Sequence, residues 1–308
     1  MQCMERPSIL RVPLRTLGAP ARKGSDVQWR ILQAARSHRV GVRVRIIPKR
    51  RQPNAAGQVE NRILGALLRT EYRRLIGRME HVELKRGAIL YRAEQEIEHV
   101  YFPEDAVVAM VDTMANSRTV EVGIIGIEGL VGINIFLGGV TTPDKAVVQV
   151  PGGAMRMRSR ELRREIRFGS PLQRLLLRYT QAFVAVISQS VACCEHHSVE
   201  QRLARWVLTM HEYTHPRELV MSHLNIAAML GTRRSGVSVA AAIFRRLGLI
   251  CYSRGRIKVL DKPGLERKSC ECYRYIKRQY AGWRQQVPRL LSGDDSPTRP
   301  AAARKQRR

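Results

Sequence analysis

The stretch SHLNIAAMLGTRRSGVSVAAAIFRRL, residues Ser222–Leu247, decides the fold. A helix-turn-helix needs a small residue where its helices meet, a turn residue that tolerates a left-handed backbone, and apolar residues that face inward from both helices. Ala227 supplies the small contact and Gly231 the turn, and Ser222 is predicted to cap the first helix. The second helix is predicted from about Arg234 to Leu247. The inward apolar positions are Ile226, Leu230, Val237 and Ala240.

The next segment, LICYSRGRIKVLD, predicts a β-hairpin directly after the second helix. Two alternating runs, Leu249–Tyr252 and Arg256–Leu260, flank the turn sequence Ser253-Arg254-Gly255. Helix, glycine turn, helix and basic hairpin in succession favour a winged helix-turn-helix, although an αα-hairpin followed by an unrelated β-hairpin would imitate this order. The basic residues of the hairpin that suit phosphate contacts are Arg254, Arg256 and Lys258.

The net charge of +28 is distributed unevenly along the chain. Residues 217–280 carry 14 Lys/Arg against 4 Asp/Glu, whereas residues 59–216 are nearly balanced, with 20 against 18. Residues 1–58 carry 13 against 2. A basic block of this kind attracts a polyanion because binding releases condensed counterions. A solubilising face is the alternative interpretation.

The part before the helix-turn-helix predicts a β-rich domain. Residues 1–58 show no sustained period and are interrupted by five prolines, so we expect disorder there. This segment is either a nucleic-acid-binding arm or a non-native extension from an upstream start codon. Order is expected to begin near Asn61 with a short helical pair. Short β-type runs punctuated by Gly, Pro and Asp then extend from Val82 to Met157 and indicate an antiparallel barrel or roll.

A long helix is predicted to follow the β-rich part. Ser170-Pro171 is a helix start, and no Gly or Pro interrupts the chain from there to His215. Residues spaced alternately by three and four positions form a seam typical of a coiled coil, which favours a dimerisation helix over one packed in the core of its own domain. The seam residues are Leu176, Tyr179, Phe183, Val186, Ser190, Cys193 and His197.

Several classes of protein do not fit the sequence. No run of 18 or more apolar residues occurs, so we expect no membrane span, and no apolar segment follows the basic N-terminus as it would in a secretory signal. Six cysteines in 308 residues do not form a disulfide framework, and a reducing cytoplasm is the simpler interpretation. We find no nucleophile–base arrangement and no phosphate-cradling glycine loop, so we expect that the protein is not an enzyme and needs no cofactor.

Four segments carry a resemblance to a known family. They are VEVGIIGIEGLVGINIFLGG (Val120–Gly139), HSVEQRLARWVL (His197–Leu208), AAMLGTRRSGVSVA (Ala227–Ala240) and LGLICYSRGRIKVLD (Leu247–Asp261). In this order, the chain from about Asn61 to Tyr280 resembles the Crp/Fnr family of bacterial transcription regulators. The resemblance implies an α+β fold with an N-terminal antiparallel β-roll of the cyclic-nucleotide-binding type, a long dimerisation helix and a C-terminal winged helix-turn-helix. The expected divisions are residues 1–58 (basic extension), 59–168 (β-roll), 169–197 (dimerisation helix), 198–280 (winged helix-turn-helix) and 281–308 (basic disordered tail).

The resemblance also implies which residues contact DNA. Mapped without gaps from Gly231, the positions aimed at base edges are Arg234, Ser235 and Val239, and Arg233 is expected to meet a phosphate. An arginine pairs bidentately with guanine O6 and N7, whereas Val239 can only pack on a thymine methyl group. The operator is therefore expected to differ from that of the cyclic-AMP-responsive members.

The effector pocket departs from the pattern of those members. A cyclic-nucleotide site needs a Glu for the ribose hydroxyl, but Ile133 follows Gly132 where that Glu is expected. Asp144 and Lys145 stand where Arg-Ser is expected, and an Asp would repel the cyclic phosphate. We therefore expect that cyclic-AMP binding is lost and leave the small-molecule effector unknown.

The cysteines do not predict a metal site. Cys193 and Cys194 are adjacent on a helix and point about 100° apart, and Cys270-Glu-Cys272 is too tight for a tetrahedral knuckle. His196 and His197 resemble ligands, but His197 follows the helical seam and no further set converges with it. The expectation is that no metal is bound and that the cysteines are buried or bystander residues.

Together these features predict a cytoplasmic, homodimeric, sequence-specific transcription regulator. Its partners would be double-stranded DNA with a palindromic operator, a second copy of the chain, and RNA polymerase, with no membrane involved. The alternative is a non-specific nucleic-acid-binding protein driven by its basic tails.

Overall fold

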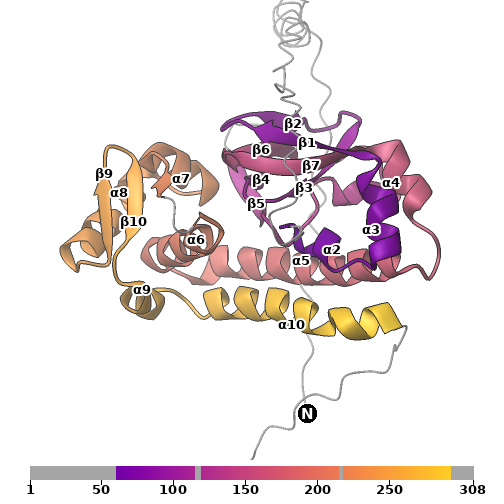
Figure 1. The fold of residues 1–308 in the computed structure, drawn as a ribbon. Helices are drawn as coiled ribbons and strands as arrows, with labels where there is room; N and C mark the ends of the chain where they lie inside the picture. The colour runs from indigo at the N-terminus through magenta and orange to yellow at the C-terminus, as the bar shows by residue number, and fades with distance from the viewer. Residues whose placement is uncertain (1–59, 115–118, 215–217, 293–308) are drawn as a thin grey trace, which may run out of the picture. The chain divides into compact units, whose positions relative to one another are not determined.

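The computed structural model describes residues 60–114, 119–214 and 218–292 (Figure 1). The prediction for residues 1–58 and the last part of the predicted tail, 293–308, therefore lie outside the described residues.

Seven strands of the N-terminal part form two antiparallel sheets (Figure 1). The strand orders are β1-β7-β3 and β2-β6-β4-β5. Every neighbouring pair is antiparallel, which confirms the predicted antiparallel roll. The strands are β1 (Met79–Leu84), β2 (Ile89–Tyr91), β3 (His99–Pro103), β4 (Val107–Thr113), β5 (Thr119–Ile125), β6 (Lys145–Val150) and β7 (Gly152–Arg158).

Strand β4 is apolar on both of its faces, and the structure shows why. Residues Val107–Val111 are all buried. Val108 and Met110 lie in the core of the roll, whereas Val107 lies with Val150 of β6 in the core of the C-terminal part. A strand covered on both faces has a continuous apolar run instead of an alternating one.

Short helices close the ends of the roll. Asn61 is fully buried and caps the first of them, because its Oδ1 accepts the N–H groups of Ile63 and Leu64 at 3.1 and 3.3 Å. Its Nδ2 donates to the carbonyls of Pro103 and Gly129, which attaches this helix to the roll. The helices are α2 (Arg62–Gly65), α3 (Arg69–Ile76), the 3-10 turn η1 (Ile133–Ile135) and α4 (Ser159–Glu165).

Two long helices lie along one another beneath the roll (Figure 1). Helix α5 (Pro171–His196) begins as predicted, with the Ser170 side chain accepting the Gln173 N–H at 3.2 Å. Helix α10 (Cys272–Ser292) returns along it in the opposite direction, and its Ile276 and Tyr280 enter the core of the roll. Because α10 continues to Ser292, the expected disordered tail beginning at residue 281 is wrong for residues 281–292.

The predicted dimer seam of α5 is also wrong, because its apolar residues are buried within one chain. Leu176, Tyr179, Phe183 and Val186 are at most 7% exposed and belong to the core of the roll, together with Ile276 and Tyr280 of α10. Cys193 is buried as well, and Ser190 and His197 are half-buried. The alternative interpretation, that α5 packs in the core of its own domain, fits the burial of these seam residues. The apolar residues left exposed on α5 are Leu177, Val184 and Val191.

Among the described residues, one helix is long and apolar enough to cross a membrane by length and composition. This is α5, whose most apolar window has a mean hydropathy of 1.2. One such helix is weak evidence for a membrane span, because the core helix of a soluble protein passes the same test.

The C-terminal part is a winged helix-turn-helix. Helices α7 and α8 meet at Gly231, whose φ of +59° lies in the left-handed region that favours glycine. The hairpin turns at Arg254 and Gly255, both with positive φ, as a tight two-residue hairpin turn requires. The elements are α6 (Val199–Thr214), β8 (Leu219–Val220), α7 (His223–Met229), α8 (Arg234–Arg246), β9 (Ile250–Ser253), β10 (Arg256–Val259) and α9 (Lys262–Lys268), with the sheet order β8-β10-β9.

Candidate nucleic-acid interface

The turn between α7 and α8 is set by local interactions. Ser222 caps α7 by accepting the Asn225 N–H at 3.2 Å, and the Thr232 N–H donates to the Ala227 carbonyl at 2.9 Å across the turn. Ala227 is 3% exposed and Val237 is fully buried, so the two helices pack closely at their crossing. This packing leaves the leading end of α8 at the surface.

All seven residues expected to contact DNA are exposed. They are Arg233, Arg234, Ser235, Val239, Arg254, Arg256 and Lys258. Val239 is 62% exposed, which is unusual for a valine in a helix with a packed face. An apolar side chain held in solvent on the same helix as Arg234 suits contact with the methyl groups of the major groove.

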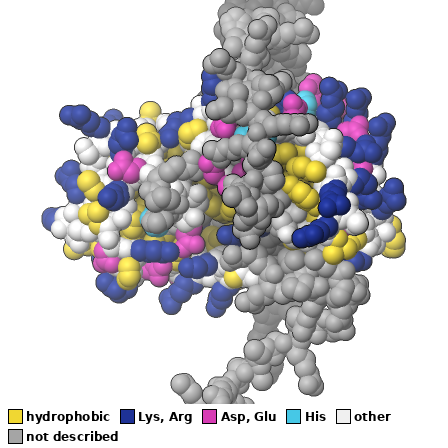
Figure 2. Space-filling view, viewed as in Figure 1, with side chains coloured by type: hydrophobic (Ala, Val, Ile, Leu, Met, Phe, Trp, Pro, Cys, Tyr) yellow, Lys and Arg dark blue, Asp and Glu magenta, His cyan; other side chains and the backbone are white. Residues whose placement is uncertain are grey.

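The leading end of α8 is electrostatically suited to an anion. Its first turn contains no acidic residue, and its N-cap, Arg233, makes no capping hydrogen bond with its side chain. The first N–H groups of a helix have no partner within the helix, and the helix dipole places partial positive charge there. Two arginines add full charges at the same place. In Figure 2, Lys and Arg side chains lie along the outer edge on the left, with Asp and Glu side chains among them.

A histidine that the sequence analysis did not single out joins the wing to both helices. His223, the first residue of α7, stacks on Tyr252 of β9 with ring centroids 4.2 Å apart. Its Nδ1 lies 3.0 Å from the Ser238 hydroxyl of α8. Burial, with a further contribution from Arg234, lowers the pKa of His223. No sequence signal points to this residue, because its role depends on three elements that meet only in the fold.

Comparison with known proteins agrees with this geometry. Residues 201–268 match the model of the Crp-like helix-turn-helix domain. The protein carries a Crp-like helix-turn-helix domain.

Two solved structures show that about three fifths of the chain has the fold of the Crp/Fnr regulators. A transcriptional regulator of the CRP family from Thermus thermophilus is 20% identical, with a TM-score of 0.53, over 61% of this chain and 95% of that chain. FixK2 from Bradyrhizobium japonicum is 14% identical, with a TM-score of 0.55, over 62% of this chain and 98% of that chain. No curated protein matches the chain significantly in sequence.

A buried arginine links α5 to the turn of the Crp-like domain. Arg202 of α6 is 8% exposed and donates to the carbonyl of Leu230, the C-cap of α7. The same guanidinium lies 3.3 Å from the Cys194 sulfur near the end of α5. A shift of α5 would therefore reach the helix-turn-helix through one side chain.

Two carboxylates join the roll to α6. Glu121 of β5 accepts from the Trp206 indole at 3.4 Å, and Glu128 accepts from the Tyr213 hydroxyl at 2.6 Å. Burial raises the pKa of Glu121 to about 7, although the indole and the charge of Arg205 oppose the shift. Burial likewise raises the pKa of Glu128. The carboxyl group of Glu121 is therefore partly protonated near neutral pH.

The residues expected at a cyclic-nucleotide pocket are buried or half-buried in the roll. Gly132 has a φ of +90°, and Ile133 is 5% exposed and belongs to the core. Asp144 is 8% exposed and accepts the Thr142 hydroxyl at 2.6 Å, and burial raises the pKa of its carboxyl group. Lys145 is half-buried at the start of β6.

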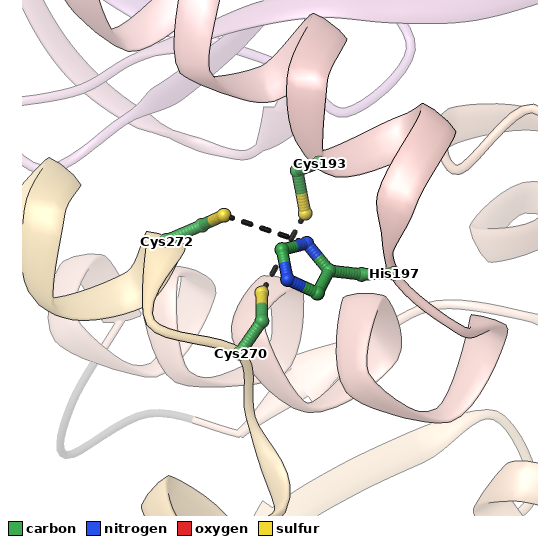
Figure 3. A group of neighbouring side chains, drawn as sticks. All are labelled: Cys193, His197, Cys270 and Cys272. Carbon is green, nitrogen blue, oxygen red and sulfur yellow. Dashed lines mark hydrogen bonds between the residues drawn. The ribbon is translucent and has the colours of Figure 1, made fainter.

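The structure corrects the expectation that the cysteines and His197 do not converge. Cys193, His197, Cys270 and Cys272 point toward one another, with all their ligand atoms within 4.8 Å (Figure 3). The hydrogen bond between the sulfurs of Cys193 and Cys270 lowers the pKa of the Cys193 thiol to about 5 and raises the pKa of the Cys270 thiol. Cys270 and Cys272 are too close in sequence to form a knuckle by themselves. Their sulfurs lie instead beside Cys193 and His197 at the end of α5.

Proposed function

We propose that the protein is a dimeric transcription regulator that binds a specific operator through its Crp-like domain. The observation that carries this proposal is the exposed N-terminal end of α8. Its first turn contains no acidic residue, and Arg233 and Arg234 lie at its start. Such a protein would act in the cytoplasm, where it meets both DNA and RNA polymerase.

The exposed residues divide into two groups by the kind of contact that their chemistry supports. Arg234, Ser235 and Val239 lie on the first two turns of α8, where they would read base edges. The phosphate contacts would come from Arg233 and from the three basic residues of the wing, Arg254, Arg256 and Lys258. Base contacts determine specificity, whereas phosphate contacts position the protein and weaken with salt.

The dimer would form through the exposed face of α5. Leu177, Val184 and Val191 are 51%, 54% and 67% exposed, and they recur at intervals of seven residues. A seven-residue interval keeps apolar side chains on one stripe of a helix, as in a coiled coil. Pairing along this stripe would present two α8 helices to half-sites about one helical turn apart.

The roll would control the Crp-like domain without cyclic AMP. The buried Ile133 and Asp144 offer neither a partner for a ribose hydroxyl nor a cation for a cyclic phosphate. A change in the roll would reach the helix-turn-helix through Glu121 and Trp206, through α5 and Arg202, or directly from Gln149 to Met229. Control would then consist of a shift between two packings of these contacts.

Selection of bound sequences from random DNA tests the proposal. The full chain should enrich a palindrome with half-sites about one helical turn apart, and Arg234→Ala should lose preference at one or more base positions in each half-site. Failure to enrich any motif at physiological salt would contradict sequence-specific binding.

The basic N-terminal segment favours a second candidate, non-specific nucleic-acid binding. Residues 1–58 carry 13 Lys/Arg against 2 Asp/Glu. Deleting residues 1–58 and 293–308 leaves the described elements intact and discriminates between the two candidates. A surviving footprint supports sequence-specific binding by the Crp-like domain, whereas loss of all binding supports non-specific binding by the basic terminal segments.

A further inference from the structure

Four potential metal ligands meet where the end of α5 lies beside the start of α10 (Figure 3). Cys193 and His197 are one helical turn apart at the end of α5, and Cys272 is the first residue of α10. Cys270 precedes it by two residues. We propose that Cys193, His197, Cys270 and Cys272 bind one zinc ion.

The distances between the ligand atoms fit a single tetrahedral ion. Zinc binds thiolates at about 2.3 Å and imidazole at about 2.0 Å, so in a tetrahedron two sulfurs lie about 3.8 Å apart and a sulfur and a nitrogen about 3.6 Å apart. The sulfurs of Cys193 and Cys270 are 3.6 Å apart. The sulfur of Cys272 lies 3.6 Å from Nδ1 of His197. Two of the six pairs of ligand atoms therefore already lie near tetrahedral distances, and all six lie within 4.8 Å.

The surrounding groups support the ligands in the manner of a structural metal site. Nδ1 of His197 faces the sulfurs, while its Nε2 lies 3.2 Å from a carboxylate oxygen of Glu271. A ligating histidine commonly donates its other ring N–H to a carboxylate, which fixes the tautomer. Gln189 donates from Nε2 to the Cys272 sulfur at 3.1 Å, as suits a sulfur that carries negative charge.

The donor set and its burial select the kind of ion. Three thiolates and one imidazole form a closed Cys3His set, which structural zinc sites use, and soft sulfur ligands disfavour magnesium and calcium. The three cysteines are at most 3% exposed, so no open position faces solvent for a substrate. With all ligand atoms within 4.8 Å of one another, the space suits one ion and not a cluster of several irons.

A zinc ion at this place would fasten the two long helices together. The site joins the last turn of α5 to the segment that leads from the Crp-like domain into α10. It lies next to Cys194, which contacts Arg202 and through it the turn of the helix-turn-helix. The ion would therefore hold the junction between α5 and the Crp-like domain in one arrangement.

The metal content of the full chain, purified under reducing conditions, tests the proposal. We expect about one zinc per chain, and X-ray absorption should show three sulfurs at about 2.3 Å and one nitrogen at about 2.0 Å. This measurement needs no variant, so it stands even if a substituted chain fails to fold. A folded wild-type chain that takes up less than roughly a tenth of an equivalent when zinc is supplied would overturn the proposal.

Substitutions identify the ligands. Cys193→Ser and Cys272→Ser should each lose most of the zinc, whereas Cys194→Ser, the exposed neighbour on the same helix, should keep it. Glu271→Gln should weaken zinc affinity by about 10-fold, the lower end for a supporting carboxylate, because this side chain is 71% exposed. Equal zinc loss in Cys193→Ser and Cys194→Ser, or a Cys193–Cys270 disulfide in the zinc-supplied protein, would also overturn the assignment.

Discussion

The proposed dimer face on α5 yields the sharpest prediction. The double substitution Val184→Glu and Val191→Glu places two carboxylates on the exposed stripe and leaves the buried face of the helix untouched. Glutamate is a good helix former, so α5 itself should persist. Phe183 is unsuitable for this test, since it is 3% exposed and stacked on Tyr179, and its replacement would damage the core of the roll.

The exposed areas set the magnitude. Full burial of a valine side chain contributes about 1.5 kcal/mol. Val184 and Val191 still expose 54% and 67% of their area in one chain, so pairing would add about 0.9 kcal/mol for each. A two-fold axis counts both residues twice, which makes a loss of about 3.6 kcal/mol, or a roughly 400-fold rise in the dimer Kd. Repulsion between the introduced carboxylates adds to this loss.

Sedimentation over a range of protein concentrations measures the dimer Kd, and a footprint on the selected operator measures DNA binding. Both should weaken together in the double variant, while its circular dichroism stays that of the wild type. Leu137→Glu, at a residue that is 58% exposed on the roll, is the matched control and should change neither. A double variant that still sediments as a dimer with wild-type affinity would refute the assignment of the exposed stripe.

Four further substitutions test single residues. Arg234→Ala should lose about 1–3 kcal/mol of discrimination at one base position, whereas Lys258→Ala should weaken binding to all sequences alike and reduce the salt dependence of log K by about one unit, both measured by gel shifts at several salt concentrations. Glu121→Gln should remove a pH-dependent loss of stability, measured by urea unfolding at pH 5 and pH 8. The pKa of Glu121 is raised from 4.5 to about 7, so the wild type loses up to about 3 kcal/mol as pH rises between these values, and the variant lacks this loss. Gly236→Ala should raise the free energy of unfolding by about 0.5–1 kcal/mol, because alanine favours the helix and its Cβ would meet Val199 at an ordinary 3.5 Å.

Each of these expectations has an outcome that contradicts it. Uniform weakening in Arg234→Ala would place that arginine on a phosphate instead of a base. The same pH dependence in Glu121→Gln and the wild type would show that another group titrates. A destabilised Gly236→Ala variant would mean that α8 cannot accommodate the added methyl group at its crossing with α6.

The winged helix-turn-helix was predictable because its signals are local. Ser222 caps α7 by accepting the N–H of a residue three positions later. Gly231 has a left-handed conformation at the turn between α7 and α8. The bounds predicted for α8 and for the wing lie within one or two residues of those observed. The roll was predictable at the level of its class, from short runs of β-type residues separated by turns.

The dimer seam and the cysteine cluster were not predictable for the same physical reason. Periodicity shows that α5 has an apolar face but says nothing about what covers it, and here α10 and the roll cover it. The Cys3His cluster joins residues more than 70 positions apart and exists only because α10 returns along α5. The sequence therefore allowed Cys193 to be interpreted as a seam residue or as a buried bystander, and neither interpretation included Cys270.

The path of α10 has a consequence for dividing the protein into parts. The Crp-like match ends at residue 268, yet Ile276 and Tyr280, which lie beyond it, help to close the core of the roll beside Phe183. A chain truncated after residue 268 would leave part of the core of the roll open to water, and so would a roll cut off after α5. Chimaeras that exchange the roll between proteins of this fold must therefore transfer the C-terminal helix together with the roll.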